Sequence, residues 1–155
     1  MRRTRMKGGL GLVLLTALVG CGDEEAAPLQ IQTIQLVERA ASDAVVDNEP
    51  AGDSAGDVLT FSNLLFDATN TTQMGTDQGY CVRMVAGESW ECTWTAFLSD
   101  GQLTVSGPFY DRKGSVLAIT GGTGAFKGAH GQMQLEFRDS PTQEYTFIYQ
   151  VLLSQ

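Results

Sequence analysis

The sequence is short of the residues on which metal sites, nucleic-acid binding and helical folds depend. It contains one histidine, His130, in 155 residues, which excludes a metal site built from two or more imidazoles. Its ten lysines and arginines face 18 aspartates and glutamates, and a chain this acidic repels phosphate backbones, so we expect no nucleic-acid partner. No segment shows the period of an amphipathic helix. What is left is an acidic, β-rich chain long enough for one domain.

The first 20 residues have the pattern of an export signal. Residues 1–7 are basic, residues 8–19 form an apolar run too short for a permanent membrane span, and a small residue precedes Cys21. The Leu-x-Gly-Cys ending resembles a bacterial lipobox, in which the cysteine becomes the first mature residue and carries a lipid. We therefore expect an extracytoplasmic protein, anchored to a bacterial cell membrane through the lipid on Cys21. An ordinary signal peptide with a coincidental cysteine is the alternative.

The mature chain divides into a tether and one domain. Residues 21–29 are expected to form a short acidic tether, and residues 30–155 a β-barrel domain. Four of the ten basic residues lie in the signal, so six remain against 18 acidic residues, a mature net charge of −12. Residues 39–56 are acidic and lack a sustained apolar period, which predicts a long loop.

Short β-rich segments with period-two alternation or continuous apolar character follow one another along the domain. They predict about eight antiparallel strands, a number that suits a small closed barrel or a sandwich. A barrel is favoured because it leaves no exposed sheet edge. The expected strands are residues 30–37, 58–66, 79–85, 90–98, 103–109, 115–120, 131–138 and 144–153.

Two cysteines remain once Cys21 carries a lipid. A two-residue turn at Ala86-Gly87 would place Cys81 directly opposite Cys92 on neighbouring strands, at close to disulfide distance. An oxidising compartment favours their pairing, so we expect a disulfide. The alternative is a reactive thiol, although no histidine or metal partner is visible nearby to activate one.

A glycine-rich stretch, residues 119–131 (ITGGTGAFKGAHG), lacks the spacing and the following helix of a nucleotide-binding loop. It resembles the signature of the allene oxide cyclases and, in a looser form, that of the dirigent proteins. Residues 56–63 (GDVLTFSN), 101–109 (GQLTVSGPF) and 145–147 (YTF) resemble further cyclase segments in the same order. The resemblance covers about residues 56–153 and implies an eight-stranded antiparallel closed barrel with an apolar cavity.

The resemblance also implies a site. In the plant cyclases, a glutamate on the first strand and a water held by an asparagine assist ring closure of an unstable fatty-acid allene oxide. Asn63 matches that asparagine, and the alignment puts Gln35 at the glutamate position, where Gln35→Glu would be expected to raise turnover. Sliding the alignment by three residues would instead seat Glu38 there. Arg83 shares a strand face with Cys81, and it must lie at the rim or hold an anion. The expected ligand-binding residues are Phe61, Cys81, Trp90, Trp94, Phe109 and Arg83.

Three functions are compatible with these features. The first is a lipid-anchored cyclase-like barrel, an isomerase if it is an enzyme, that binds a small apolar molecule of fatty-acid or polyketide type and steers its cyclisation or isomerisation. The second is a non-catalytic dirigent-like guide or hydrophobic-ligand carrier, favoured by glutamine at position 35. The third is a filled structural barrel. We expect no cofactor and no metal, and the resemblance implies a homo-oligomer, a trimer in the plant relatives.

Overall fold

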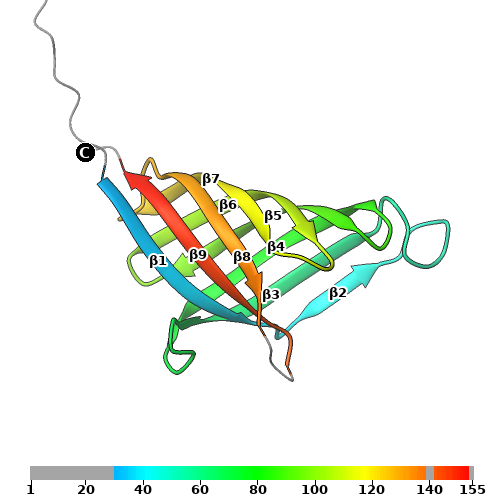
Figure 1. Ribbon diagram of the computed structural model, residues 1–155, viewed down its shortest axis with the longest axis horizontal. Helices are drawn as coiled ribbons and strands as arrows, with labels where there is room; N and C mark the ends of the chain where they lie inside the picture. Colours follow the sequence, from blue (N-terminus) through cyan, green and yellow to red (C-terminus); the bar gives the residue numbers. More distant parts are fainter. Residues whose placement is uncertain (1–29, 139–141, 154–155) are drawn as a thin grey trace, which may run out of the picture.

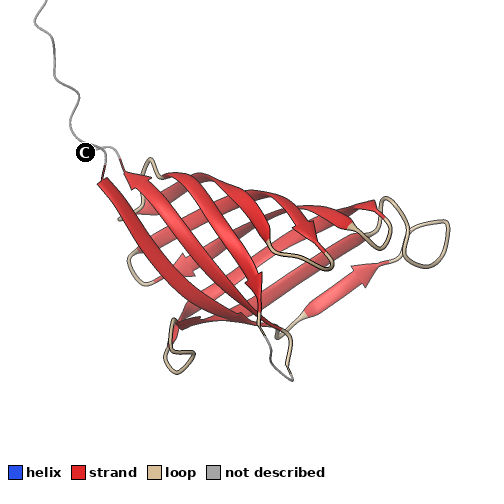
Figure 2. Cartoon of the chain, in the orientation of Figure 1, coloured by secondary structure: helices blue, strands red, loops and turns tan. Residues whose placement is uncertain are grey.

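The computed structural model describes residues 30–138 and 142–153, and all of the elements within these ranges are strands (Figure 2). The expected signal peptide, the lipidated Cys21 and the acidic tether lie outside the described residues. No helix in the described part of the chain is long and apolar enough to cross a membrane. The strands are β1 (Gln30–Arg39), β2 (Asp43–Val46), β3 (Val58–Asp67), β4 (Gln73–Val85), β5 (Ser89–Leu98), β6 (Gly101–Tyr110), β7 (Ser115–Gly124), β8 (His130–Phe137) and β9 (Glu144–Leu153).

Eight of these strands form a closed antiparallel barrel (Figure 1). Each strand from β3 to β9 pairs with the next, β9 pairs along the whole of β1, and β1 closes the ring by pairing with the second half of β3. The predicted fold class and strand number are confirmed. β8 and β9 have the predicted lengths, and the other barrel strands are longer than the sequence patterns indicated, most of all β4, which begins at Gln73 rather than at residue 79.

The segment expected to be one long acidic loop contains a short strand, which corrects that prediction. β2 pairs with the first half of β3, where β1 has already ended, so β1 and β2 share β3 as a common neighbour. All four residues of β2 are exposed. A strand without a buried face has no alternation to detect in the sequence, which is why it was missed.

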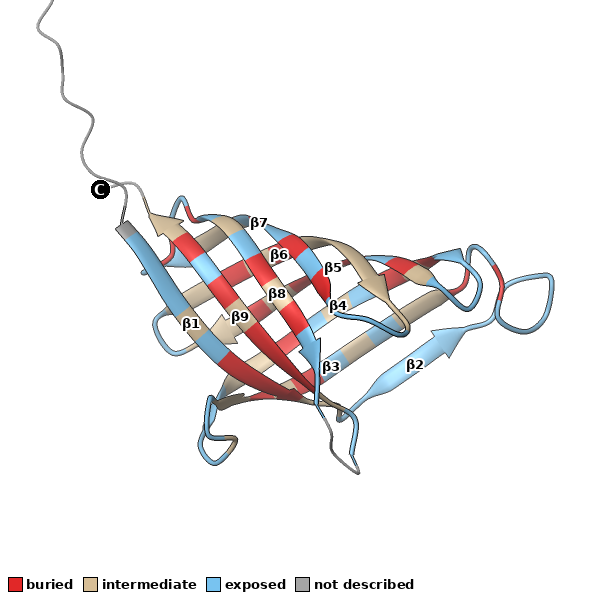
Figure 3. Ribbon diagram, in the orientation of Figure 1, coloured by how far each residue is buried: buried red, intermediate tan, exposed pale blue. Residues whose placement is uncertain are grey.

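Buried residues alternate with more exposed ones along the strands, and the buried set forms the core (Figure 3). On β5, Trp90, Cys92, Trp94 and Ala96 are buried, while the residues between them are not. Because successive side chains of a strand point to opposite faces, closing the sheet gathers one set inside the barrel. β6, β7, β8 and β9 show similar alternation, and β1, β3 and β4 add buried residues such as Leu36, Leu65 and Cys81.

The glycine-rich stretch forms the end of β7, the tight β7–β8 connection and the start of β8. Gly124 and Gly128 have φ values of +61° and +76°, which disfavour any residue with a side chain. A Cβ on Gly122 would collide with the backbone of Phe126, whose ring is buried. The glycines therefore let the Phe126 segment fold back closely against β7.

The hairpin of β4 and β5 has the predicted register, with Cys81 opposite Cys92, and the expected disulfide joins them. The Cα atoms of the two cysteines are 4.0 Å apart. The turn is one residue longer than expected, because a bulge between Arg83 and Val85 pairs Val85 with Ser89.

The disulfide closes a loop with a sequence separation of 11, so it lowers the conformational entropy of the unfolded chain. We expect the Cys81→Ser/Cys92→Ser double variant to lose about 2–3 kcal/mol of unfolding free energy in urea titrations. The wild-type protein after reduction is the matched control, and it should unfold at the same urea concentration as the double variant. Equal midpoints for the oxidised and reduced wild-type protein would contradict this expectation.

Candidate functional site

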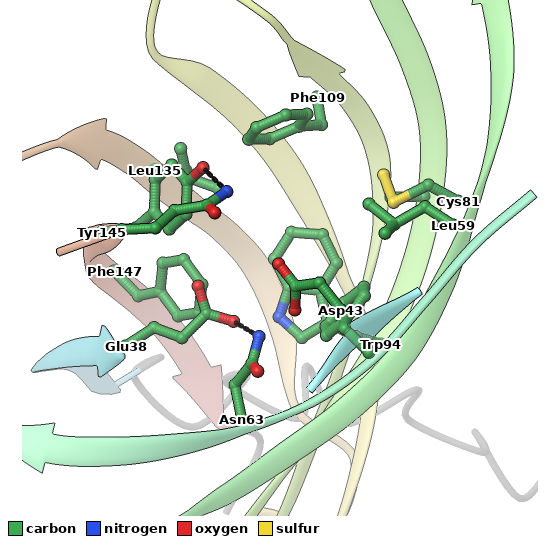
Figure 4. A pocket seen from close by; sticks show the side chains of 13 residues that line it. Glu38, Asp43, Leu59, Asn63, Cys81, Trp94, Phe109, Leu135, Tyr145 and Phe147 are labelled. Carbon is green, nitrogen blue, oxygen red and sulfur yellow. Dashed lines mark hydrogen bonds between the residues drawn. A yellow bond between two sulfur atoms is a disulfide. The ribbon is translucent and has the colours of Figure 1, made fainter. Parts of the chain in front are cut away.

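A cavity of about 70 Å³ lies inside the barrel, toward the end where β1 finishes and β9 begins (Figure 4). Trp94 is central to its wall, with the Phe61 ring 5.9 Å and the Phe147 ring 5.6 Å from the indole, measured between centroids. Phe109 and Tyr145 meet edge to face at 5.8 Å. The lining residues are Glu38, Asp43, Leu59, Phe61, Asn63, Cys81, Cys92, Trp94, Phe109, Leu135, Gln143, Tyr145 and Phe147.

The structure places four of the six expected ligand-binding residues on this wall, namely Phe61, Cys81, Trp94 and Phe109. They come from β3, β4, β5 and β6, and each points inward because of the strand alternation. Both sulfurs of the disulfide belong to lining residues, as the shared inward face of the two cysteines implies. The wall is therefore aromatic and sulfur-rich, with little polar surface.

Arg83 and Trp90 do not line the cavity, which corrects their placement in a ligand site. The Arg83 guanidinium contacts both carboxylate oxygens of Asp111, at 2.7 and 2.8 Å, and its Nε lies 2.6 Å from Asp53. Its Cζ sits 4.0 Å above the Trp90 ring. The charge of Arg83 is thus already neutralised by two acids of the chain, and Trp90 is covered by the cation.

Gln35 does not line the cavity. Glu38 does, and it lies where the alignment had led us to expect Gln35. Gln35 is exposed, whereas Glu38 is 4% exposed and lines the cavity. The inward residues of β1 are Ile34, Leu36 and Glu38, which join the core or the cavity. The alignment that chose Gln35 has the wrong parity, and an odd shift along a strand turns every side chain to the other face.

Asn63 holds the Glu38 carboxyl in position. Its Oδ1 accepts hydrogen bonds from the backbone N–H groups of Ala41, at 2.7 Å, and Ser42, at 3.2 Å. Because backbone N–H groups can only donate, this fixes the amide orientation and turns Nδ2 toward Glu38, to which it donates at 2.9 Å. The break between β1 and β2 provides these two donors, so this short connection helps to build the site.

A second acid, Asp77, completes a buried carboxyl pair. Asp77 stands opposite Asn63 in the β3–β4 register and is 0% exposed, and neither of its carboxyl oxygens has a hydrogen-bond partner among the described residues. Burial raises the pKa of Asp77 to about 7. Burial, reinforced by the neighbouring Asp77, raises the pKa of Glu38 well above its ordinary value. The pair therefore holds a proton more tightly than ordinary carboxyl groups do.

Sequence reasoning missed Asp77, although a signal for it exists. Asp77, Gly79, Cys81 and Arg83 share one face of β4 by alternation, and only the part from residue 79 was assigned to the strand. Extending the strand by one more alternation would have placed an acid inside the barrel. Tyr149 is a further buried polar residue of the interior, and burial together with the nearby Asp77 raises its pKa, so its hydroxyl stays protonated.

Gly79 makes room for the central indole. It pairs with Trp94, and a Cβ at position 79 would collide with Trp94 Cβ and with the Thr93 carbonyl oxygen. We expect Gly79→Ala to lower the unfolding free energy by about 1–3 kcal/mol, through overpacking. Gly121→Ala is the matched strand control, because a Cβ there meets nothing within 4 Å, and it should change stability by less than about 0.5 kcal/mol. Urea titrations compare the two variants, and equal effects would show that Trp94 needs no such space.

The fold and cavity define a small antiparallel barrel that encloses an aromatic cavity, with Glu38 and Asp43 as its acidic lining residues. The chain belongs to the allene oxide cyclase family, whose pattern it matches over residues 26–154. Solved structures of similar fold include a pyocyanin demethylase, 24% identical, with a TM-score of 0.65 over 76% of this chain and 100% of that one. The pterocarpan synthase dirigent protein GePTS1 is 16% identical, with a TM-score of 0.72 over 90% of this chain and 98% of its own. The exo-specific intermolecular Diels-Alderase AbnU is 14% identical, with a TM-score of 0.63 over 80% and 99%.

Proposed function

We propose that the barrel binds a small apolar molecule in the aromatic cavity and steers its cyclisation or isomerisation. The observation that carries this proposal is Glu38, a buried acid with a raised pKa, oriented by Asn63 and presented to an otherwise apolar chamber. The cavity volume of about 70 Å³ is below the range of roughly 300–1,000 Å³ common for ligand pockets. The ligand is therefore small, or it inserts one ring and leaves the rest at the mouth.

The geometry suits a reaction in which an oxygen atom gains negative charge. In an allene oxide, ring closure opens the epoxide C–O bond and forms a C–C bond, while the oxygen becomes a carbonyl and no atom is gained or lost. A neutral Glu38 carboxyl can donate a hydrogen bond to that oxygen as the bond opens. The aromatic wall would hold one conformer and exclude water. Membership of the cyclase family and the ring-forming activity named for AbnU support this direction.

The test is the optical purity of a cyclisation product. A short-chain vinyl allene oxide without a carboxyl group, generated in situ, cyclises spontaneously to a racemic cyclopentenone. With the protein present, we expect faster ring closure and an excess of one enantiomer. An enantiomeric excess without rate acceleration would favour the non-catalytic dirigent-like guide. A racemic product at the spontaneous rate would contradict both.

We also propose that the protein acts outside the cytoplasm, anchored through Cys21. The lipobox-like sequence supports this proposal, and so does the disulfide, because disulfides persist in oxidising compartments. Mass spectrometry of the protein from bacterial membranes should find the mature N-terminus at Cys21 with acyl chains. An unmodified Cys21 in a soluble fraction would contradict the anchor.

A further inference from the structure

The charged residues at the cavity are all acidic. Glu38 and Asp43 line it from β1 and β2, and Asp77 is buried in the adjacent β4, opposite Asn63. Within the described part of the chain, no lysine, arginine or histidine is among the lining residues. A ligand that carried a carboxylate would therefore lose its hydration without finding a cation inside.

The arginines nearest to this end of the barrel are already engaged by acids of the chain. Arg83 is held between Asp53 and Asp111, as described above. Arg39 bonds to Asn70 at 2.8 and 2.6 Å, and its Nε lies 3.7 Å from Glu144. Arg138, which follows β8, likewise has its Nε 3.3 Å from Glu144. None of the three guanidinium groups is available to pair with a ligand anion unless one of these contacts breaks.

Two further cations lie outside the chamber. Arg112 and Lys113 border a separate hollow together with Gly87, Glu88 and Tyr110. The Lys113 ammonium sits 4.1 Å from the centre of the Tyr110 ring. This hollow shares no lining residue with the aromatic cavity, so it gives the cavity no basic group.

The aromatic rings of the cavity wall also influence which ligands the cavity favours. Phe61, Trp94, Phe109, Tyr145 and Phe147 all contribute rings to the lining. Ring faces carry partial negative charge, so they attract cations, and they stack well against flat molecules. The acidic groups and the ring faces therefore favour the same kind of guest.

We infer, on the basis of the proposed ligand-binding function, that the cavity accepts flat molecules that are neutral or positively charged and excludes carboxylates. A guest of the fatty-acid type would have to leave its carboxylate outside the barrel or carry it as an ester. The groups that set this preference are Asp43 and the buried Asp77, and the other titratable groups of this interior are Glu38 and the Tyr145 and Tyr149 hydroxyls, all three with raised pKa values. Because the raised pKa of Asp77 is about 7, cation binding should tighten as the pH rises from 6 to 8.

The experiment compares three bicyclic probes of similar size, one in each charge state. These are the cation N-methylquinolinium, the neutral 1-naphthalenemethanol and the anion 1-naphthoate. NMR titrations follow the indole N–H signals of Trp94, which lines the cavity, and of Trp90, which does not. The Trp90→Phe variant assigns the two signals. At pH 8 we expect the Trp94 signal to report binding of the cation about tenfold or more tighter than that of 1-naphthoate, with the neutral probe between them.

The Asp43→Asn variant is the test of cause. It should weaken the binding of N-methylquinolinium, strengthen the binding of 1-naphthoate and leave the affinity for 1-naphthalenemethanol unchanged. Binding of 1-naphthoate at the Trp94 signal as tight as that of the cation would overturn the charge preference while leaving the proposed function in place. Failure of all three probes to shift the Trp94 signal would overturn ligand binding itself, and the charge preference with it.

Discussion

Replacing Glu38 with glutamine is expected to slow the ring closure of the short-chain vinyl allene oxide by about 100-fold and to lower its enantiomeric excess. Glutamine has nearly the same shape and can still meet Asn63, but it has no acidic O–H group to present to the developing oxygen charge. The cavity walls stay the same, so any residual selectivity reports what confinement alone contributes. Initial rates and chiral chromatography of the product measure both effects.

Gln35→Glu is the matched control for this prediction. It introduces a carboxylate three residues earlier on β1, at an exposed position that does not line the cavity. We expect it to leave rate and selectivity unchanged, in contrast to the gain that the alignment with the family predicted. A Glu38→Gln variant with the rate of the parent, or a rate increase in Gln35→Glu, would contradict the assignment of the acid to Glu38.

The second large effect is on stability. Asp77→Asn is expected to raise the unfolding free energy at pH 8 by on the order of 3 kcal/mol and to have little effect near pH 4. The pKa of Asp77 is raised to about 7 in the folded protein, from about 4 in an unfolded chain. Above pH 4 the unfolded chain therefore binds fewer protons at this site than the folded chain, so stability falls as the pH rises toward 7. Asparagine cannot ionise and removes this loss.

Urea titrations between pH 4 and pH 8 measure the effect, and Asp67→Asn provides a control of opposite sign. The Thr71 backbone N–H donates to the Asp67 carboxylate at 2.9 Å, and this bond lowers the pKa of Asp67 to about 2. Asp67→Asn should therefore destabilise the protein at neutral pH, with the loss disappearing as the pH falls through 2. A stability of Asp77→Asn that parallels the parent at every pH would show that Asp77 is ionised and solvated.

The barrel could be predicted because its strands repeat a local pattern. The alternation of Trp90, Cys92 and Trp94 predicts the inward face of β5 without any knowledge of the neighbouring strands. The turn between Cys81 and Cys92 then sets the register of β4 against β5. The disulfide followed from the same two facts. The short strand β2 could not be predicted, since its residues are exposed and its only support is pairing with β3.

The site was harder to predict than the fold because it depends on parity and on burial of acids. In β1, a shift of three residues decides whether Gln35 or Glu38 faces the interior, and Leu36 and Val37 are both buried, so the apolar pattern does not choose. An aspartate such as Asp77 usually marks a solvated position. Its place inside the barrel follows from the alternation of β4 only when the strand is extended beyond its apolar part.

The central claim is that Glu38 is a buried acid with a raised pKa inside an aromatic cavity, and carbon-13 NMR of its carboxyl group tests this most directly. With the signal assigned by its loss in Glu38→Gln, we predict that the carboxyl titrates well above the ordinary glutamate pKa and that its signal shifts when 1-naphthalenemethanol is added. A carboxyl that titrates near the ordinary glutamate pKa of about 4.3 and does not respond to the probe would contradict the account.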